Sequence, residues 1–211
     1  MSRRRSQKAF TLVEMLIVFA ILSILASLAV YTYVSQLGKI RLNNSTRALH
    51  NSLQLAKMRA ATTSMPHGVL IDRGGGAEDP TVPGRIYVFI DCDRDGVFTD
   101  DDDDPSNNPI INSPADCPAD RDALLRDQPF IELERGIYFT NVLDDKSSNV
   151  SLVFTELGHC LQGSDFVDGE IHLQNSDERA GKVDSQGIVI LGAAGVTDTI
   201  PRGVVDKNAW K

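Results

Sequence analysis

Aromatic residues are scarce in this chain of 211 residues: they make up 6% of it, and Trp210 is the only tryptophan. Basic residues are also few, since 21 lysines and arginines face 29 aspartates and glutamates, for a formal net charge of −8 at pH 7. Four of the basic residues fall within the first nine positions, which leaves 17 basic and 29 acidic residues elsewhere, a net charge of −12. This acidity and the lack of stacking surfaces argue against a nucleic-acid partner.

Catalytic signatures are missing as well. The sequence has no Gly-x-Ser-x-Gly, and Arg73-Gly74-Gly75-Gly76 is not followed by the Gly-Lys-Ser/Thr of a phosphate-binding loop. The four histidines are scattered along the chain: His50, His67, His159 and His172. We therefore expect a protein that is not an enzyme and requires no cofactor. Its 42% hydrophobic content is enough for one globular domain with an appendage.

A long apolar run begins close to the N-terminus, and nearly every residue from Met15 to Val34 belongs to it. About 20 residues at a rise of 1.5 Å each span the roughly 30 Å hydrocarbon core of a bilayer, so the run predicts a membrane helix. The basic residues that precede it place the N-terminus in the cytoplasm by the positive-inside rule. Everything after Val34 is then expected on the far side of the membrane.

Two ordinary explanations of this run compete with a more specific one. Ser27-Leu28-Ala29 could serve as the cleavage site of a secretory signal peptide, and the run could also be a plain, uncleaved anchor. The run is longer than the apolar part of a signal peptide, and Glu14 lies in its leading edge. A carboxylate near the membrane interior costs about 2–3 kcal/mol by insertion scales, so Glu14 is expected to have a partner.

The string Lys8-Ala9-Phe10-Thr11-Leu12-Val13-Glu14 resembles the processing site of type IV prepilins and type II secretion pseudopilins. The resemblance implies that prepilin peptidase cuts between Ala9 and Phe10 on the cytoplasmic face and N-methylates Phe10. The residue before the cut is usually glycine in this family, so Ala9 implies slower cleavage. The resemblance further implies a single-pass protein of the inner membrane, with a cytoplasmic N-terminus and a periplasmic C-terminal domain.

Glu14 is expected to act in filament assembly. A cut before Phe10 exposes an amine within the lipid, where a lone amine and a lone carboxylate are each costly but are tolerated as a pair. The amine of one subunit can meet Glu14 of its neighbour, and such a head-to-tail contact builds a helical filament. The expected partners are other pilin or pseudopilin subunits and the inner-membrane assembly platform.

The helix is expected to continue beyond the membrane, from about Thr11 to Ala61, until Pro66 ends the segment. Apolar and small residues recur there at alternating four- and three-residue steps, which predicts one face packed against the protein's own domain. The residues of this stripe are Leu42, Thr46, Leu49, Leu53, Ala56 and Ala60.

The remainder of the chain is predicted to form β-strands. Short runs rich in Val, Ile, Tyr and Phe predict them at 68–72, 85–90, 130–133, 137–142, 150–155, 170–173, 181–184 and 188–191. The predicted fold class is α+β, with a long N-terminal helix packed on antiparallel β-sheets, as in pilins. The predicted divisions are a leader (1–9), a transmembrane half-helix (10–34), an amphipathic half-helix (35–65) and a β-rich domain (66–211) with an acidic loop (91–128).

Alternating aspartates precede a glycine in the acidic loop, in the pattern Asp-x-Asp-x-Asp-Gly used by hard-cation loops. By that pattern, Ca²⁺ would take three side chains, one backbone carbonyl and a closing carboxylate: Asp91, Asp93, Asp95, Val97 and Asp102. A strand rather than a helix precedes the loop, so it is not an EF-hand proper. A solvated turn whose acids favour turn conformations accounts for the same residues, and both interpretations stay open.

Three cysteines allow at most one internal disulfide. A Cys92–Cys117 bridge would clip the ends of the acidic segment, a Cys117–Cys160 bridge is the other pairing, and the third possibility is no bridge. Zinc binding is disfavoured because the spacings are wide and no histidine pair accompanies them.

The strand 86–90 with the Asp91 that ends it, the Asp/Gly-rich turn and then Asp122-Ala123-Leu124-Leu125-Arg126 resemble the GspH/FimT branch of minor pseudopilins and minor pilins. About twenty residues near 103–121 are inserted within that motif and are expected to form an exposed loop. The resemblance implies a structural subunit of a type II secretion pseudopilus or of a type IV pilus. The alternatives are a membrane-anchored periplasmic calcium-binding module and, as a lesser one, a DNA-uptake minor pilin, whose late arginines are missing from Gly187-Ile188-Val189-Ile190.

Overall fold

The computed structural model describes residues 11–75, 79, 81–98, 108–111, 113–118, 122–125, 130–143, 149–163, 165–175, 185–191 and 196–203. The chain divides into two compact units, Met1–Leu37 and Gly38–Lys211. One helix, α1 (Leu12–Thr63), is continuous across the boundary, and Gly38 does not interrupt it.

The N-terminal part of α1 belongs to the first unit and is apolar. An 18-residue stretch of it has a mean hydropathy of 2.6, and none of that stretch is buried inside the molecule. Two of its serine hydroxyls bond within the helix: Ser23 donates to the carbonyl of Ala20 at 2.8 Å, and Ser27 donates to that of Ile24 at 2.7 Å. Because these two serines do not need water as a partner, they are compatible with lipid, and the stretch has the length and hydropathy of a membrane-spanning helix.

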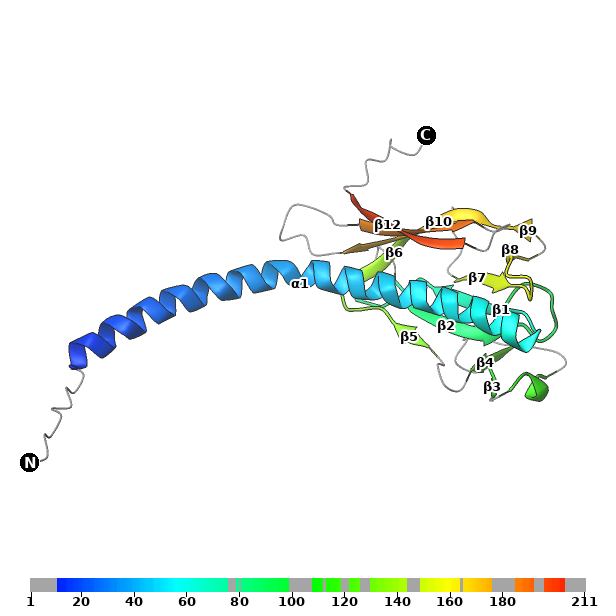
Figure 1. The fold of residues 1–211 in the computed structure, drawn as a ribbon, viewed down its shortest axis with the longest axis horizontal. Coiled ribbons are helices and arrows are strands. Elements are labelled where there is room, and N and C mark those ends of the chain that lie inside the picture. The colour runs from blue at the N-terminus through cyan, green and yellow to red at the C-terminus, as the bar shows by residue number, and fades with distance from the viewer. Residues whose placement is uncertain are drawn as a thin grey trace, which may run out of the picture. The chain divides into compact units, whose positions relative to one another are not determined.

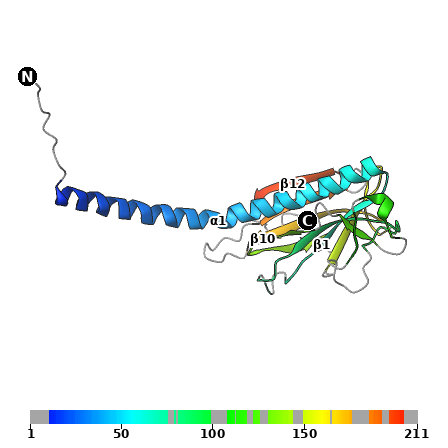
Figure 2. The ribbon, with the colours of Figure 1, turned by 90° about the horizontal axis from the view of Figure 1, so that it is seen from below.

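The second part of α1 packs within the second unit, and the predicted stripe is confirmed. Five residues of the stripe are fully buried, and Thr46 is 1% exposed. The Thr46 hydroxyl donates to the carbonyl of Leu42 at 2.8 Å, which lets a polar side chain occupy a core position. The stripe shares one hydrophobic core with residues of the strands, and both views place this half of α1 against them (Figures 1 and 2).

The described strands form two sheets. The larger has the order β3-β4-β2-β1-β7-β8-β9, with β5 pairing beside β2, and only its β3–β4 pair is parallel. The smaller is antiparallel, in the order β12-β11-β10-β6. The bounds are β1 His67–Asp72, β2 Arg85–Ile90, β3 Ile110–Ile111, β4 Ala123–Leu125, β5 Ile131–Glu132, β6 Ile137–Val142, β7 Asn149–Phe154, β8 Cys160–Gln162, β9 Asp165–Phe166, β10 Asp168–Asn175, β11 Ser185–Leu191 and β12 Val196–Gly203.

Both faces of the larger sheet are buried at β2. Ile86, Val88 and Ile90 face the core that contains the α1 stripe. Tyr87 and Phe89 face the other way, as the two-residue period of a strand requires, and lie in a second cluster of buried residues. Burial on both sides explains why β2 is a continuous apolar run rather than an alternating one.

The predicted α+β class is confirmed, with one long helix packed on mainly antiparallel sheets. The exposed loop predicted near 103–121 is wrong in part, because Ile110–Ile111 forms β3 and Ile111 is only 7% exposed. The strands that were not predicted are β3, β4, β8, β9 and β12. The first four have only two or three residues and so carry little periodicity, although the equally short β5 falls within the predicted run 130–133. The predicted strand at 181–184 lies outside the described residues.

Candidate functional site

The predicted processing region is described only from Thr11 onward. Ala9 and Phe10 lie outside the described residues, and Glu14 lies in the first turn of α1 with its side chain exposed. The Thr11 hydroxyl accepts a hydrogen bond from the backbone N–H of Glu14 at 3.2 Å and so caps the helix. Thr11 and Glu14 have the spacing of a capping box, and an acid in the first turn also suits the helix dipole. Glu14 is therefore well suited to the first turn of α1, through its backbone hydrogen bond to Thr11 and its negative charge near the helix N-terminus.

The acidic loop is organised by the pairing of β2 with β4. Asp91 directly follows β2 and Asp122 directly precedes β4. The two strands are antiparallel with Ile90 opposite Ala123, so the register brings the two aspartates to the same end of neighbouring strands. The backbone N–H of Cys92 donates to Oδ1 of Asp122 at 2.9 Å, which joins the two strand ends directly.

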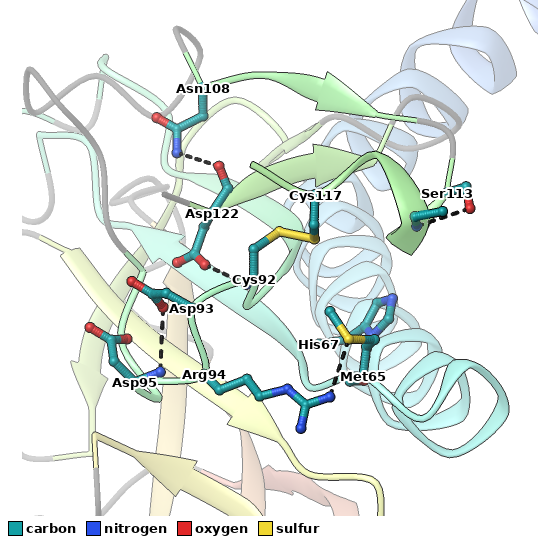
Figure 3. The surroundings of a disulfide bond; sticks show 11 residues. Met65, His67, Cys92, Asp93, Arg94, Asp95, Asn108, Ser113, Cys117 and Asp122 are labelled. Atoms are coloured by element: carbon teal, nitrogen blue, oxygen red, sulfur yellow. Dashed lines mark hydrogen bonds between the residues drawn. A yellow bond between two sulfur atoms is a disulfide. The ribbon is translucent and has the colours of Figure 1, made fainter. Parts of the chain in front are cut away.

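A disulfide closes this part of the structure. Cys92 and Cys117 are bonded, with their Cα atoms 5.7 Å apart across a sequence separation of 25 (Figure 3). Asn108 donates from Nδ2 to the carbonyl of Asp122 at 3.2 Å and fixes the same segment from its other side. Cys160 is free and buried, and its burial raises the pKa of its thiol to about 12, so it is an unreactive core residue.

The aspartates of the loop shape its turns. The Asp95 carboxylate accepts from the N–H of Val97 at 2.8 Å, and Asp93 accepts from the N–H of Asp95 at 3.3 Å. Gly96 has a φ of +79°, and a side chain at this position would collide with the carbonyl oxygen of Gly163. Only glycine suits both the positive φ and the close contact with Gly163, so the turn predicted at this residue requires glycine.

Three carboxylates converge at the start of the loop. Asp91, Asp93 and Asp122 each offer one oxygen, and these oxygens lie within 4.8 Å of one another. Asp91 is 1% exposed and Asp122 fully buried, whereas Asp93 is exposed. Figure 3 shows the carboxylates of Asp93 and Asp122 side by side next to the disulfide.

The predicted calcium ligands are thus only partly brought together. Asp91 and Asp93 lie in the cluster, while the Asp95 carboxylate is engaged with the N–H of Val97. Asp102 lies outside the described residues. Asp122 was not among the ligands predicted from the sequence. The sequence shows Asp122 as an acid directly before an apolar run. Identifying it as a ligand requires knowing that this run forms β4 and pairs with β2.

Among the described residues of the loop, Asp91 has a clearly shifted pKa. Burial, the largest cause, and the nearby Asp93 together raise its pKa to about 6, although the backbone amides of Gly96 and Arg94 act in the opposite direction. Its Oδ2 accepts from the N–H of Gly96 at 3.2 Å. Its Oδ1 is buried and accepts no hydrogen bond from any residue in the described part of the chain.

Without divalent cations, we expect the free energy of unfolding to fall as the pH rises from about 4 to about 6. The pKa of Asp91 is about 6 in the fold against an ordinary value of 3.8, so the folded state holds this proton more tightly and loses that advantage as the pH rises through both values. The difference corresponds to roughly 3 kcal/mol. Denaturant unfolding of the full chain in detergent micelles with EDTA, between pH 4 and 7, measures it.

Asp91→Asn is the control for this experiment, because an amide of the same size cannot ionise. Subtracting its pH profile from that of the wild type isolates the contribution of Asp91 from those of the other acids. Identical profiles for the two proteins would contradict the prediction.

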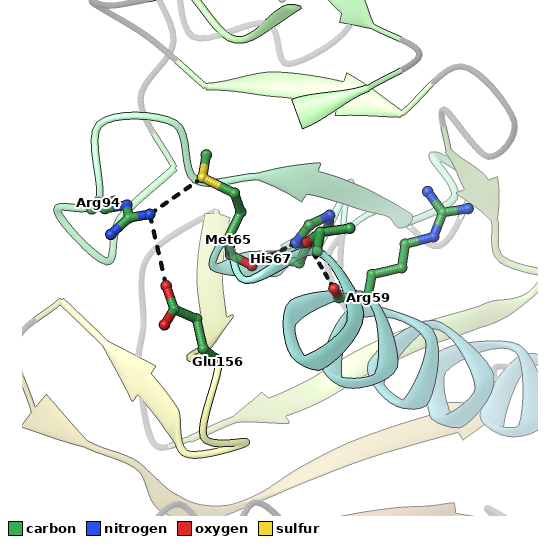
Figure 4. A network of polar contacts seen from close by, with 6 residues as sticks. Arg59, Met65, His67, Arg94 and Glu156 are labelled. Atoms are coloured by element: carbon green, nitrogen blue, oxygen red, sulfur yellow. Dashed lines mark hydrogen bonds and ion pairs between the residues drawn. The ribbon is translucent and has the colours of Figure 1, made fainter. Parts of the chain in front are cut away.

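Arg94 extends from the loop to the end of α1 and the turn after β7. Its guanidinium lies 3.4 Å from the sulfur of Met65 and 3.7 Å from the carboxylate of Glu156 (Figure 4). His67 contacts the same methionine, with Nδ1 2.9 Å from the carbonyl of Met65, and burial lowers its pKa. On the exposed side of the loop, Arg94 therefore links the loop to Met65 after α1 and to Glu156 after β7.

Comparison with known proteins gives one finding for the N-terminal region. A family model described as the prokaryotic N-terminal methylation motif matches residues 4–30. No curated protein and no solved structure matches the chain. The motif supports a type IV pilin-like protein that is processed by prepilin peptidase and serves as a structural subunit, and the apolar part of α1 fits a membrane anchor as in type IV pilins.

Proposed function

We propose that this chain is a minor pilin or minor pseudopilin of the GspH/FimT kind. It is made as a precursor in the inner membrane, cut between Ala9 and Phe10, and N-methylated on Phe10. It then joins a helical filament through α1, with Glu14 meeting the terminal amine of a neighbouring subunit. The filament is the pseudopilus of a type II secretion system or a type IV pilus. It assembles on a platform in the inner membrane, and a separate assembly ATPase supplies the energy.

The observation that carries the proposal is the methylation motif at residues 4–30, which runs directly into α1. In α1, an exposed apolar stretch suited to lipid is followed by a stripe buried in the core of a β-rich domain. A precursor motif, an anchor and a packed domain on one continuous helix are what a filament subunit needs. The helix anchors the subunit in the membrane before assembly, and it provides the surface through which subunits contact one another along a filament.

A membrane-anchored calcium-binding module is the second candidate, favoured by the three converging carboxylates. It requires the anchor but no processing at Phe10. DNA uptake receives less support, because the chain beyond the leader carries a net charge of −12.

In cells that contain prepilin peptidase, we expect the mature chain to begin at an N-methylated Phe10. Intact-mass spectrometry of the purified protein, followed by sequencing of its N-terminal peptide, measures this. Ala9→Gly is expected to be processed faster, because glycine is the usual residue before the cut, and Ala9→Val is expected to keep its leader, because a branched side chain does not fit a site for small residues.

Two results would contradict the proposal. A chain that keeps Met1 in the presence of the peptidase indicates a plain anchor, and a chain that begins at Val30 indicates a cleaved secretory signal. Cells that lack the peptidase are the matched control, since the wild-type chain should keep its leader there.

A further inference from the structure

We propose that Asp91, Asp93 and Asp122 form a Ca²⁺ site that ties the end of β2 to the start of β4. The site differs from a contiguous cation loop, because its third carboxylate comes from a segment about thirty residues further along the chain. The inference is independent of the filament role, since it concerns only residues of the second unit.

The spacing of the three oxygens suits one calcium ion. Ca²⁺ is bound by oxygen ligands at about 2.3–2.6 Å, so two ligands on opposite sides of an ion are about 5 Å apart. The three carboxylate oxygens lie within 4.8 Å of one another, which allows a single ion to contact all of them. Ca²⁺ takes 6–8 oxygens in flexible geometry, so water can complete the shell on the side of the exposed Asp93.

A second observation points to a ligand at this place. Asp91 is only 1% exposed, and its Oδ1 is buried and accepts no hydrogen bond from the described residues. A carboxylate oxygen shielded from water and left without a donor is costly, and such groups in native proteins normally have a partner. A cation held between Asp91 and its two neighbours supplies that partner.

Contacts among the described residues hold the three carboxylates in place. Asp122 is positioned by the N–H of Cys92, and the Cys92–Cys117 disulfide limits how far the two segments can separate. Arg94, a cationic residue of the same loop, extends toward Met65 and Glu156 (Figure 4), and Figure 3 shows it directed away from the carboxylates of Asp93 and Asp122. This arrangement is that of a preorganised site, in which binding needs little rearrangement.

Calcium titration of the full chain in detergent micelles, after removal of metal with EDTA and dialysis, tests the proposal. Isothermal titration calorimetry is expected to give one Ca²⁺ per chain with a Kd of about 10⁻⁵ to 10⁻³ M, the range of sensor and extracellular sites. At about one hundred times the Kd, Ca²⁺ should raise the Tm of the β-rich domain by roughly 5–10 °C. Mg²⁺ should act more weakly, because it demands a tighter octahedral shell.

Asparagine variants distinguish this ligand set from the contiguous loop. Asp122→Asn keeps the size of the side chain and an oxygen for the N–H of Cys92, and it should weaken Ca²⁺ binding at least about tenfold. Asp93→Asn should do the same, and because Asp93 is exposed this variant is expected to fold normally. Asp95→Asn is the matched control from the same loop with the same change of charge, and its Kd should stay within about threefold of the wild type.

Three outcomes would overturn the proposal. The first is a wild-type chain whose Tm and calorimetric signal do not respond to about 10 mM Ca²⁺, a concentration roughly ten times the weakest expected Kd. The second is a loss of binding in Asp95→Asn equal to that in Asp122→Asn, which would return the site to the contiguous loop. The third is undiminished binding in both Asp93→Asn and Asp122→Asn.

Discussion

Replacing Glu14 by glutamine is expected to reduce incorporation of the chain into its filament at least about tenfold while removal of the leader continues. Glutamine is accepted at the third helical position of a capping box, so the start of α1 is preserved and only the charge is lost. A terminal amine buried in a filament without its counter-charge is then left uncompensated, which costs several times the roughly 1.4 kcal/mol that corresponds to a tenfold change. Immunoblotting of sheared filaments against the membrane pool measures incorporation.

Thr11→Ala is the matched control for the Glu14 variant. It removes the hydroxyl that accepts from the N–H of Glu14 but keeps the carboxylate, so it should cost about 1 kcal/mol of helix stability and leave incorporation largely intact. If Glu14→Gln assembled like the wild type, or if Thr11→Ala lost assembly to the same extent, the capping role alone would account for Glu14. The pairing with the amine of a neighbouring subunit would then be wrong.

Leu53→Ala is expected to lower the free energy of unfolding of the β-rich domain by about 2–5 kcal/mol. Leu53 is fully buried in the core shared by the α1 stripe and the sheets, so truncation leaves a cavity that tightly packed strands cannot fill. For a domain of this size the loss corresponds to a fall in Tm of roughly 5–15 °C. Thermal unfolding of the full chain in micelles, followed by circular dichroism, measures it.

Met58→Ala on the same helix is the control, because it removes a side chain of similar size that is 58% exposed. Its effect should stay within about 0.5 kcal/mol. Equal losses in the two variants would show that the stripe does not carry the packing of α1 on the sheets.

The sequence was most informative where the relevant signal is local and periodic. The membrane-spanning stretch follows from a long, almost entirely apolar run, and the stripe from Leu42 to Ala60 follows from the helical repeat. β2 could be predicted from its composition alone, because burial on both faces leaves it almost entirely apolar. The processing motif is likewise a contiguous string, so it could be recognised without knowledge of the fold.

What the sequence could not determine depends on pairing between distant segments. The pattern of alternating aspartates suggested a contiguous loop, but the register of β2 with β4 places Asp122 beside Asp91 and Asp93. The choice of Cys92 and Cys117 from three cysteines has the same origin, because sequence spacing does not specify which Cα atoms come within 5.7 Å. The local sequence thus determined the anchor, through its apolar run, and the helix face, through its periodicity. The tertiary structure determined the acidic cluster, since strand register depends on contacts that no short stretch of sequence contains.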